Sequence, residues 1–377
     1  MSKKRKKICI TINSLGPGGA EKQCLLLAKA LSPYHSVTVV ILNPGPLYRP
    51  RLTFIEEEQL NHVYLAKNPL KRPFGLMRFL KRQQIDIIFS FLPTDTLLSS
   101  ICGKLAGVPL VFGGIRNSYM ANAKFIALKL VNNYLLNYTI ANNFAAYRSA
   151  IDFGFKKKVF VISNGIDIRP YVERKHVGVG PVHIISLGRL VPQKEYATAL
   201  KCIAHLKGIL DEGYSFTYTI VGQGPEKEKI MTDIKARELE NQVKVVTDAS
   251  DIYGMLDDSD VYLCTSSFEG VSNAIMEAMN CALPLVATDA GDNARLVLHQ
   301  KNGFITPIHD AIALANFLKK LIQSPELRIQ MGNASHTHLA KNFSFATFQK
   351  KYLKLIENSS SIQTRNGEVH YGETNVS

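Results

Sequence analysis

The sequence predicts an α/β fold with two parallel-sheet domains. Short apolar runs alternate with amphipathic segments along its 377 residues, which is the pattern of strands and helices in successive β-α-β units. This length exceeds what one hydrophobic core usually holds and suits two domains. The periodicity is interrupted between Arg169 and Pro181, where glycines and prolines gather, so this segment is expected to separate the two halves.

The apolar runs give the strands in order. Before the break they are Ile8–Ile12, Val37–Leu42, Ile85–Phe91, Leu110–Phe112, Thr139–Ala141 and Val159–Ile162. After the break they are His183–Leu187, Phe216–Val221, Val243–Val246, Val261–Cys264 and Leu285–Thr288. Amphipathic segments between them predict helices, among them Glu21–Leu31, Phe125–Asn137, Glu195–Leu210 and Ile312–Ile322.

Four segments follow from this pattern. Residues 1–170 and 171–344 are the two expected α/β domains, and a last helix near Phe345–Ile356 occupies residues 345–357. Residues 358–377 are polar and aperiodic, and they are expected to be a disordered tail.

The net charge of +14 is concentrated in the first half. Residues 1–170 hold 24 Lys/Arg and 8 Asp/Glu, a balance of +16, whereas the remaining residues have a balance of −2. We therefore expect the N-terminal half to meet an anionic partner. Lys71–Arg82 places five cations around apolar residues, and Lys3–Lys7 and Lys156–Lys158 add to the excess. Such a segment is either a helix packed on the sheet or a contact with a membrane surface.

The remaining composition indicates a cytosolic protein. No apolar run reaches 18 residues, and the N-terminus lacks the features of a signal peptide. The cysteines are scattered without a C-x-x-C pair, so buried, reduced thiols are expected rather than disulfides or a zinc site. They are Cys9, Cys24, Cys102, Cys202, Cys264 and Cys281.

Two carboxylates eight positions apart carry the strongest functional signal. Glu269 follows a predicted strand within a turn-prone loop, and Glu277 lies in a helix for which Ser272 is a good N-cap. A helix start offers unpaired backbone N–H groups and the positive end of a dipole. Phosphate-binding groups flanked by carboxylates that accept from hydroxyls suit a sugar nucleotide. The alternative is a surface loop with a solvated Glu269 and a locally paired Glu277.

Glycines and cations elsewhere would complete such a site. The run Gly16–Glu21 follows the first strand and opens a helix, but its glycine spacing differs from the dinucleotide fingerprint. Arg189 and Lys194 follow the first strand of the second half, where parallel sheets bind ligands. Their charges suit a diphosphate. The alternatives are a tight turn without a ligand and two solvated cations.

These motifs, in this order and spacing, resemble the retaining glycosyltransferases of family four over about residues 8–355. The matching segments are Gly16–Glu21, Ser163–Asp167, Ser186–Lys194, Val221–Pro225 and Ser266–Met279. The resemblance implies the GT-B fold, in which two Rossmann-like domains face a cleft and a C-terminal helix crosses back to the first domain. The first domain would bind the acceptor, and the second would bind a nucleotide sugar.

The resemblance also implies residue roles. Arg189 and Lys194 would neutralise the pyrophosphate, Glu269 would lie beside the transferred sugar, and Glu277 would bind the ribose hydroxyls. Backbone groups or turns near the donor would come from Gly18, Gly19, Gly222, Gly224, Gly270, Val271, Ser272 and Asn273. No metal site is expected, because stabilisation of the pyrophosphate by Arg189 and Lys194, as the resemblance implies it, needs no metal, and no cofactor is implied beyond the donor.

Three positions depart from the family pattern. No His follows Ile85–Phe91, where many members carry one, and Asp95 or the backbone nearby is a possible substitute in contacting the sugar. Glu195 replaces the small residue that usually follows the lysine, so the resemblance does not determine the backbone geometry beside Lys194. Arg295 stands where a Glu is common, and it either alters donor preference or faces solvent.

The expected function is transfer of a hexose or N-acetylhexosamine from a nucleotide diphosphate, most simply a UDP-sugar, to a saccharide acceptor. The variant around Ser90 resembles members that build lipid-linked or surface polysaccharides such as lipopolysaccharide or capsule. The enzyme would act at the cytoplasmic face of the membrane, held there by its basic first domain. The alternatives are a sugar-nucleotide epimerase or hydrolase of the same fold, and a basic nucleic-acid-binding protein. The latter is disfavoured, because no recognised nucleic-acid motif is present.

Overall fold

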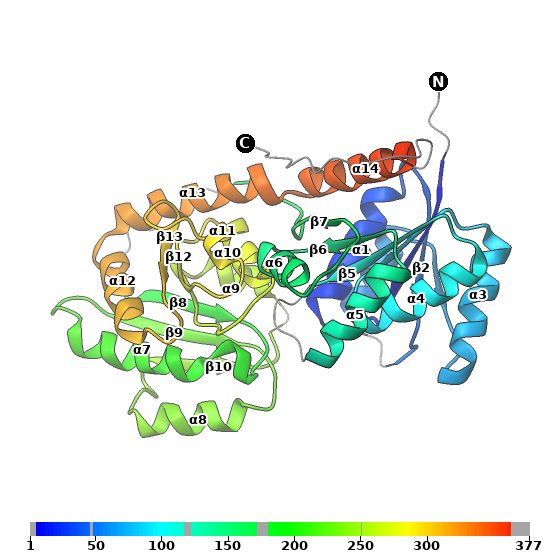
Figure 1. Ribbon diagram of the computed structural model, residues 1–377. Coiled ribbons are helices and arrows are strands. Elements are labelled where there is room, and N and C mark those ends of the chain that lie inside the picture. The colour runs from blue at the N-terminus through cyan, green and yellow to red at the C-terminus, as the bar shows by residue number, and fades with distance from the viewer. Residues whose placement is uncertain (1–4, 46–47, 117–121, 172–179, 250, 363–377) are drawn as a thin grey trace.

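The computed structural model describes residues 5–45, 48–116, 122–171, 180–249 and 251–362. Within these residues the strands form two parallel sheets, each covered by helices on both faces (Figure 1). The first sheet has the order β3-β2-β1-β4-β5-β6-β7, and the second has the order β10-β9-β8-β11-β12-β13. The expected α/β fold with two Rossmann-like domains is confirmed.

The first sheet is built from β1 (Lys7–Ile12), β2 (Ser36–Ile41), β3 (His62–Tyr64), β4 (Ile87–Ser90), β5 (Leu110–Ile115), β6 (Tyr138–Ala141) and β7 (Val159–Val161). Its helices are α1 (Gly19–Leu31), α2 (Arg49–Glu57), α3 (Arg72–Gln83), α4 (Pro93–Ala106), α5 (Asn122–Tyr134) and α6 (Phe144–Asp152), with a short 3-10 turn η1 (Pro69–Lys71) before α3.

The second sheet is built from β8 (Val182–Leu187), β9 (Phe216–Val221), β10 (Val243–Val246), β11 (Val261–Cys264), β12 (Leu285–Thr288) and β13 (Gly303–Thr306). Its helices are α7 (Tyr196–Ile209), α8 (Lys227–Ala236), α9 (Ile252–Asp257), α10 (Asn273–Asn280), α11 (Asn293–Leu296), α12 (Ala311–Gln323) and α13 (Pro325–Phe343), with a 3-10 turn η2 (Pro192–Lys194) before α7.

Every strand predicted from the sequence is present, and two further strands were missed. Both lie at sheet edges: β3 has only three residues, which are exposed or half-buried, and β13 begins with Gly303. Neither is the run of apolar residues that identifies a central strand. Strand β5 also extends past Phe112 through two glycines. A Cβ on Gly114 would stand 2.5 Å from the carbonyl oxygen of Ser90, so a larger residue would not fit there.

The last helix connects the two halves. Helices α13 and α14 (Phe345–Ile362) run one after the other along the molecule, α13 over the second sheet and α14 over the first (Figure 1). The ring of Tyr352 packs edge-on against Phe89, and Gln349 donates to the carbonyl of Ala30 in α1. The predicted crossing helix is thus present. It ends at Ile362 rather than near 357, because Ile356 and Ser359 still pack inward. The predicted disorder of 358–362 is therefore wrong, and residues 363–377 lie outside the described residues.

Burial explains two other predictions. In α3, Leu76 and Leu80 are buried in the core while Arg78, Lys81 and Arg82 are exposed. Of the two alternatives for this segment, the structure therefore shows a helix that packs its apolar side on the sheet. The six cysteines all lie within the described residues, where each is buried and none forms a disulfide bond. No helix in the described ranges is long and apolar enough to cross a membrane.

Candidate active site

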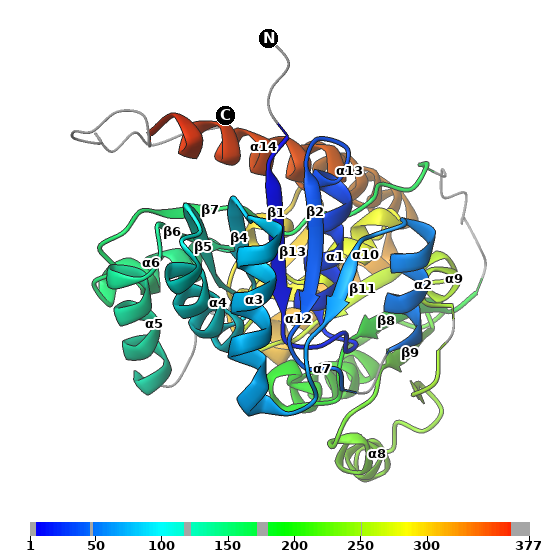
Figure 2. The ribbon, with the colours of Figure 1, turned by 90° about the vertical axis from the view of Figure 1, so that its right-hand side faces the viewer.

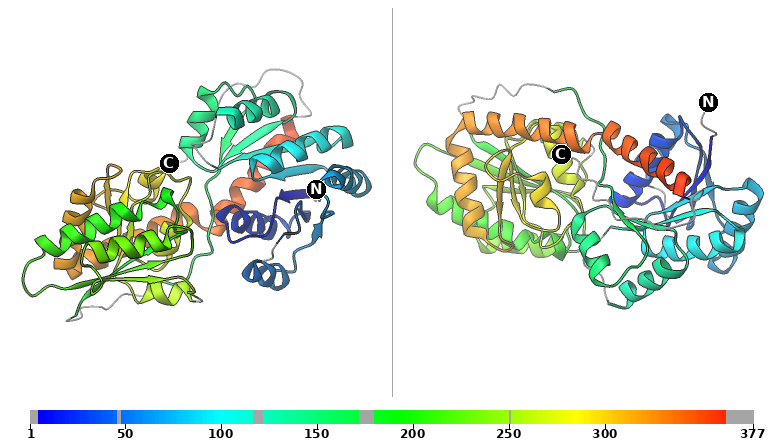
Figure 3. Two further views of the ribbon diagram at one scale, coloured as in Figure 1. Left: turned by 90° about the horizontal axis from the view of Figure 1, so that it is seen from below. Right: turned by 45° about the horizontal axis from the view of Figure 1, so that its top comes forward.

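Loops at the carboxyl ends of the two sheets meet between the two halves of the molecule. Figure 3 shows the two halves from two further directions. Strand β1 leads through residues 13–18, here called the glycine loop, into α1. Strand β11 leads through residues 265–272, which include Glu269 and are here called the carboxylate loop, into α10. These two connections meet: a Cβ on Gly19 would lie 2.4 Å from Nδ2 of Asn273. The tertiary structure thus brings together two motifs that are about 250 residues apart in sequence.

Lys194 and Glu269 form a nearly buried ion pair. Nζ of Lys194 lies 2.5 Å from Oε1 of Glu269, and their side chains are 17% and 9% exposed. Ser266 donates to the same carboxylate oxygen at 2.8 Å. Burial lowers the pKa of Lys194, but the attraction of Glu269 outweighs it and raises that pKa above its usual value. A protonated lysine therefore stands beside the carboxylate at the end of β11.

The loop after β8 is bound to the loop after β11 by hydrogen bonds. Gln193 donates to the carbonyl of Phe268 at 2.8 Å, and Ser267 N–H donates back to the carbonyl of Gln193 at 2.9 Å. Thr265 Oγ1 donates to the carbonyl of Lys194 at 3.0 Å. These bonds set the position of Lys194 relative to Glu269.

Glu195 has a left-handed backbone, with φ 52° and ψ 46°, at the start of α7. Glycine adopts this conformation without strain, whereas other residues do so at a cost. The departure noted in the sequence therefore leaves the turn in place and adds strain to it. The carboxylate of Glu195 accepts from Thr198 Oγ1 and lies 3.6 Å from His309.

Helix α10 begins as the sequence predicts. Ser272 is its N-cap, and its hydroxyl accepts from the N–H of Ile275. Glu277 follows in the second turn of α10 and pairs with Lys22 of α1, with Nζ 2.6 Å from Oε1. Burial lowers the pKa of Lys22, but Glu277 outweighs it and raises that pKa. The carboxylate expected to bind ribose is thus occupied by a cation from the other half of the molecule.

Close backbone contacts account for the other glycines. A Cβ on Gly222 would lie 1.8 Å from the carbonyl oxygen of Gly188, and one on Gly224 would lie 2.3 Å from that of Leu190. A Cβ on Gly270 would meet the carbonyl oxygen of Arg116 at 2.5 Å. The loops after β8 and β9 therefore touch. The exposed Arg189 in the first of these loops lies close enough to Lys194 for its positive charge to lower the pKa of the lysine.

A network of amides between the two halves was not predicted. Nδ2 of Asn164 donates to Oδ1 of Asn273 at 2.9 Å, and Nε2 of Gln23 donates to the same oxygen at 3.5 Å. Within the first half, Gln23 also exchanges two hydrogen bonds of 2.9 Å with the backbone of Gly165. Asp292 accepts from the N–H groups of Phe144 and Ala145, which caps α6 from the second half. Polar residues directly after apolar strands were the available sequence signal, but nothing in the sequence says which of them meet.

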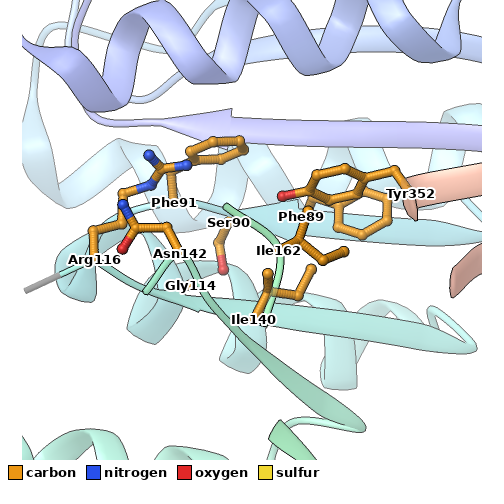
Figure 4. A pocket seen from close by; sticks show the side chains of 9 residues that line it. All are labelled: Phe89, Ser90, Phe91, Gly114, Arg116, Ile140, Asn142, Ile162 and Tyr352. Carbon is orange, nitrogen blue, oxygen red and sulfur yellow. The ribbon is translucent and has the colours of Figure 1, made fainter. Parts of the chain in front are cut away.

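A small pocket opens at the carboxyl ends of β4, β5 and β6 in the first half. Its lining residues are Phe89, Ser90, Phe91, Gly114, Arg116, Ile140, Asn142, Ile162 and Tyr352 (Figure 4). The Arg116 guanidinium lies 4.5 Å from the Phe91 ring centroid and donates to Asn164 at 3.2 Å. Burial lowers the pKa of Arg116 and raises that of Tyr352 to about 12. The pocket thus combines a cation and a neutral hydroxyl with apolar walls.

The two remaining departures have structural roles. Asp95 is fully buried and accepts from the N–H of Leu92, so it caps the start of α4. Burial raises the pKa of Asp95 to about 7. Arg295 stacks on Phe144, with 3.7 Å between the guanidinium carbon and the ring centroid. It therefore joins the two halves. Within the described ranges, no group of three or more His, Cys, Asp or Glu residues is arranged to hold a metal ion.

The fold and these loops define a glycosyltransferase of the GT-B class, and comparisons with known proteins agree. The model for "Glycosyltransferase Family 4" matches residues 17–169, and the model for "Glycosyl transferases group 1" matches residues 172–338. The two matches together span most of the chain. The protein belongs to the family-four glycosyltransferases.

Relatives of known activity are similar over most of their length. The chain is 23% identical to a Campylobacter jejuni alpha-1,4-N-acetyl-D-galactosaminyltransferase whose acceptor is named as a diphospho-undecaprenol saccharide, over 93% of this chain and 98% of the relative. It is 26% identical to the Escherichia coli UDP-Gal:alpha-D-GlcNAc-diphosphoundecaprenol alpha-1,3-galactosyltransferase, over 72% and 75%. The crystal structure of HepE from Anabaena with UDP has a TM-score of 0.81 at 21% identity, covering 94% of this chain and 100% of that one.

Proposed function

We propose that this enzyme is a retaining, metal-independent glycosyltransferase that moves a hexose or N-acetylhexosamine from a UDP-sugar to a lipid-linked saccharide in surface polysaccharide assembly. The observation that carries the proposal is the convergence of Lys194, Glu269 and Glu277 with the N-terminus of α10 and the glycine loop of α1. This set offers cations and backbone donors for a diphosphate between two carboxylates for hydroxyls.

The positions of these groups support the residue roles that the family resemblance implies. The ribose hydroxyls would donate to Glu277, and the phosphates would meet the start of α10 at Gly270, Val271, Ser272 and Asn273. Arg189 and Lys194 would stabilise the negative charge that develops on the leaving diphosphate, and Glu269 would hold Lys194 and accept from the sugar. Gly18 and Gly19 would close on the donor from the first half, and Gly222 and Gly224 would flank the nucleobase.

The relatives support the choice of substrates. Both the Campylobacter and the Escherichia enzymes named above act on saccharides carried by diphosphoundecaprenol, and the HepE structure contains UDP. We assign donor binding to residues 171–344 and acceptor binding to residues 1–170. The basic first half, with its balance of +16, would hold the enzyme on the inner face of the cytoplasmic membrane. Nucleic acid has no place in this proposal.

The first test is binding. Purified protein is screened against nucleotide sugars by thermal shift, since a ligand at 100 times its dissociation constant adds about 2.7 kcal/mol of stability. We expect a shift with a UDP-sugar that Glu277→Ala weakens and that Glu228→Ala, on the exposed face of α8, leaves intact. Absence of a shift with every nucleotide sugar would contradict the donor assignment.

The second test is transfer. With a diphosphate-linked saccharide as acceptor, Arg189→Ala and Lys194→Ala should each reduce turnover by about 100-fold or more, as expected for loss of a preorganised charge partner. The anomeric configuration of the product, read by NMR, tests retention. Activity that persists in EDTA supports metal independence. Products formed at the same rate without acceptor would instead indicate a hydrolase or epimerase.

A further inference from the structure

Helices α4 and α5 each expose a row of large apolar side chains. On α4 these are Leu97, Ile101 and Leu105, and on α5 they are Ile126, Leu130 and Tyr134, each 41–70% exposed. Residues four apart lie on one side of a helix, so each row faces a single direction. We call these six side chains the α4–α5 face. Their number and spacing distinguish them from the single exposed apolar residues that any surface carries.

The two rows lie next to each other. Helix α4 packs against both α3 and α5, and the three helices cover the same side of the first sheet (Figures 1 and 2). Leu70, in the turn η1, and Phe74, at the start of α3, are 82% and 71% exposed and extend the apolar surface. Among the described residues of the second half, the exposed large apolar residues are scattered over separate elements. They are Tyr171, Tyr214, Met231, Ile308 and Ile312.

The charges around this face have one sign. The acidic residue of α4 is Asp95, which is fully buried, and α5 has none. Lys104, Lys124 and Lys129 lie on the same two helices. Residues 70–137 contain nine Lys or Arg and two Asp. An apolar surface bordered by cations complements a bilayer with anionic headgroups, whereas a core-like interface between protein subunits is depleted in charge.

The α4–α5 face lies near the pocket of the first half, and this position links the face to the proposed acceptor site. The connection from β4 to α4 carries Phe91, and β5 is followed by Arg116 on the way to α5; both residues line the pocket of the first half. Leu97 and Ile126 lie in the first two turns of their helices, so the apolar rows begin near the pocket and continue away from it. A bilayer against these helices would therefore lie close to the acceptor side of the cleft.

We propose that the α4–α5 face docks on an anionic lipid bilayer, inserting its six apolar side chains below the headgroups while the neighbouring lysines bind the phosphates. This inference rests on the proposed function for the identity of the acceptor, whose lipid would share that bilayer. Insertion of apolar side chains adds a contact that salt does not screen, in contrast to attraction by the basic surface alone.

The experiment is co-sedimentation of the full chain with vesicles of phosphatidylcholine, with or without phosphatidylglycerol. Wild-type protein should bind the mixed vesicles and retain part of this binding at high salt. Ile101→Glu and Leu130→Glu should each weaken partitioning by about tenfold or more, because burial of the side chain is lost and a like charge is added. Ile312→Glu, at a site 60% exposed on α12 of the second half, is the matched control and should bind as wild type.

Each outcome decides the proposal. Equal binding by Ile101→Glu and Ile312→Glu, or no binding by wild type, would overturn it. A wild-type dimer that Ile101→Glu converts to a monomer, without vesicle binding, would assign the face to a second copy and overturn it as well. UDP-sugar binding without vesicles is measured in parallel and should be unchanged in Ile101→Glu. Loss of UDP-sugar binding in all proteins alongside normal vesicle results would contradict the proposed function and leave the docking face standing.

Discussion

Lys22 of α1 and Glu277 of α10 form an ion pair of 2.6 Å across the two halves of the molecule. The proposed donor site needs the same carboxylate for the ribose hydroxyls. Binding of the nucleotide must therefore separate Glu277 from Lys22 or share the carboxylate between them. The pair is 20–31% exposed, so its strength lies near that of a surface salt bridge, up to about 1 kcal/mol.

We expect Lys22→Met to tighten UDP binding by about two- to fivefold, because the nucleotide no longer competes with the lysine. Isothermal titration calorimetry measures the change. The matched control is Lys29→Met on the same helix, where Lys29 pairs with Glu58 and Asp167 instead. Weaker UDP binding in Lys22→Met would show that Lys22 holds the nucleotide itself.

The strain at Glu195 predicts a difference between two substitutions. Both Glu195→Gly and Glu195→Ala lose the side-chain contacts, but glycine alone relieves the left-handed backbone at φ 52°. The free energy of unfolding should therefore be higher for Glu195→Gly than for Glu195→Ala by about 1 kcal/mol. Chemical denaturation of the two variants measures it. Equal stabilities would mean that the backbone at this position is not strained.

Asp95 gives the protein a pH-dependent stability. Because burial raises its pKa from 3.8 to about 7, the folded state holds a proton between these pH values that the unfolded state has released. The contribution of Asp95 to the free energy of unfolding therefore falls as pH rises from about 4 to 7 and then levels off.

Asp95→Asn has no such titration and should be more stable than wild type at pH 8, by an amount on the order of a few kcal/mol. The amide oxygen of Asn can still accept from Leu92 at the start of α4. Thermal unfolding of both proteins from pH 5 to pH 8 measures the difference. Parallel curves for the two proteins over that range would contradict a raised pKa at Asp95.

The contact between Gly19 and Asn273 predicts a defect in closure. A methyl group on Gly19 would stand 2.4 Å from Nδ2 of Asn273, so Gly19→Ala should displace this amide, weaken its hydrogen bond with Asn164 and disturb the contact between the two halves. Turnover should fall by about tenfold or more, since small misplacements in an active site are costly, while the melting temperature changes little. The steric origin is tested by adding Asn273→Ala, which removes the opposing amide. The double variant should then recover part of the activity relative to Asn273→Ala alone.

Most strands of both sheets could be predicted because buried parallel strands are continuous apolar runs, as in Val261–Cys264 and Leu285–Thr288. The helix start at Ser272 was predictable as well, since capping is a local interaction between neighbours in sequence. Edge strands such as His62–Tyr64 escaped, because half of their surface faces water and their sequence carries no such run.

The sequence alone determined the α/β class, the two sheets, and the residue types at the carboxyl ends of their strands, because local periodicity and turn chemistry encode these features. The tertiary structure alone decided which of those residues meet. It paired Lys194 with Glu269 and Lys22 with Glu277, directed Asp95 into a helix cap, and gathered the apolar rows of α4 and α5 on one surface. These contacts join residues far apart in the chain, and their partners are set by the packing of whole elements, which no local pattern records.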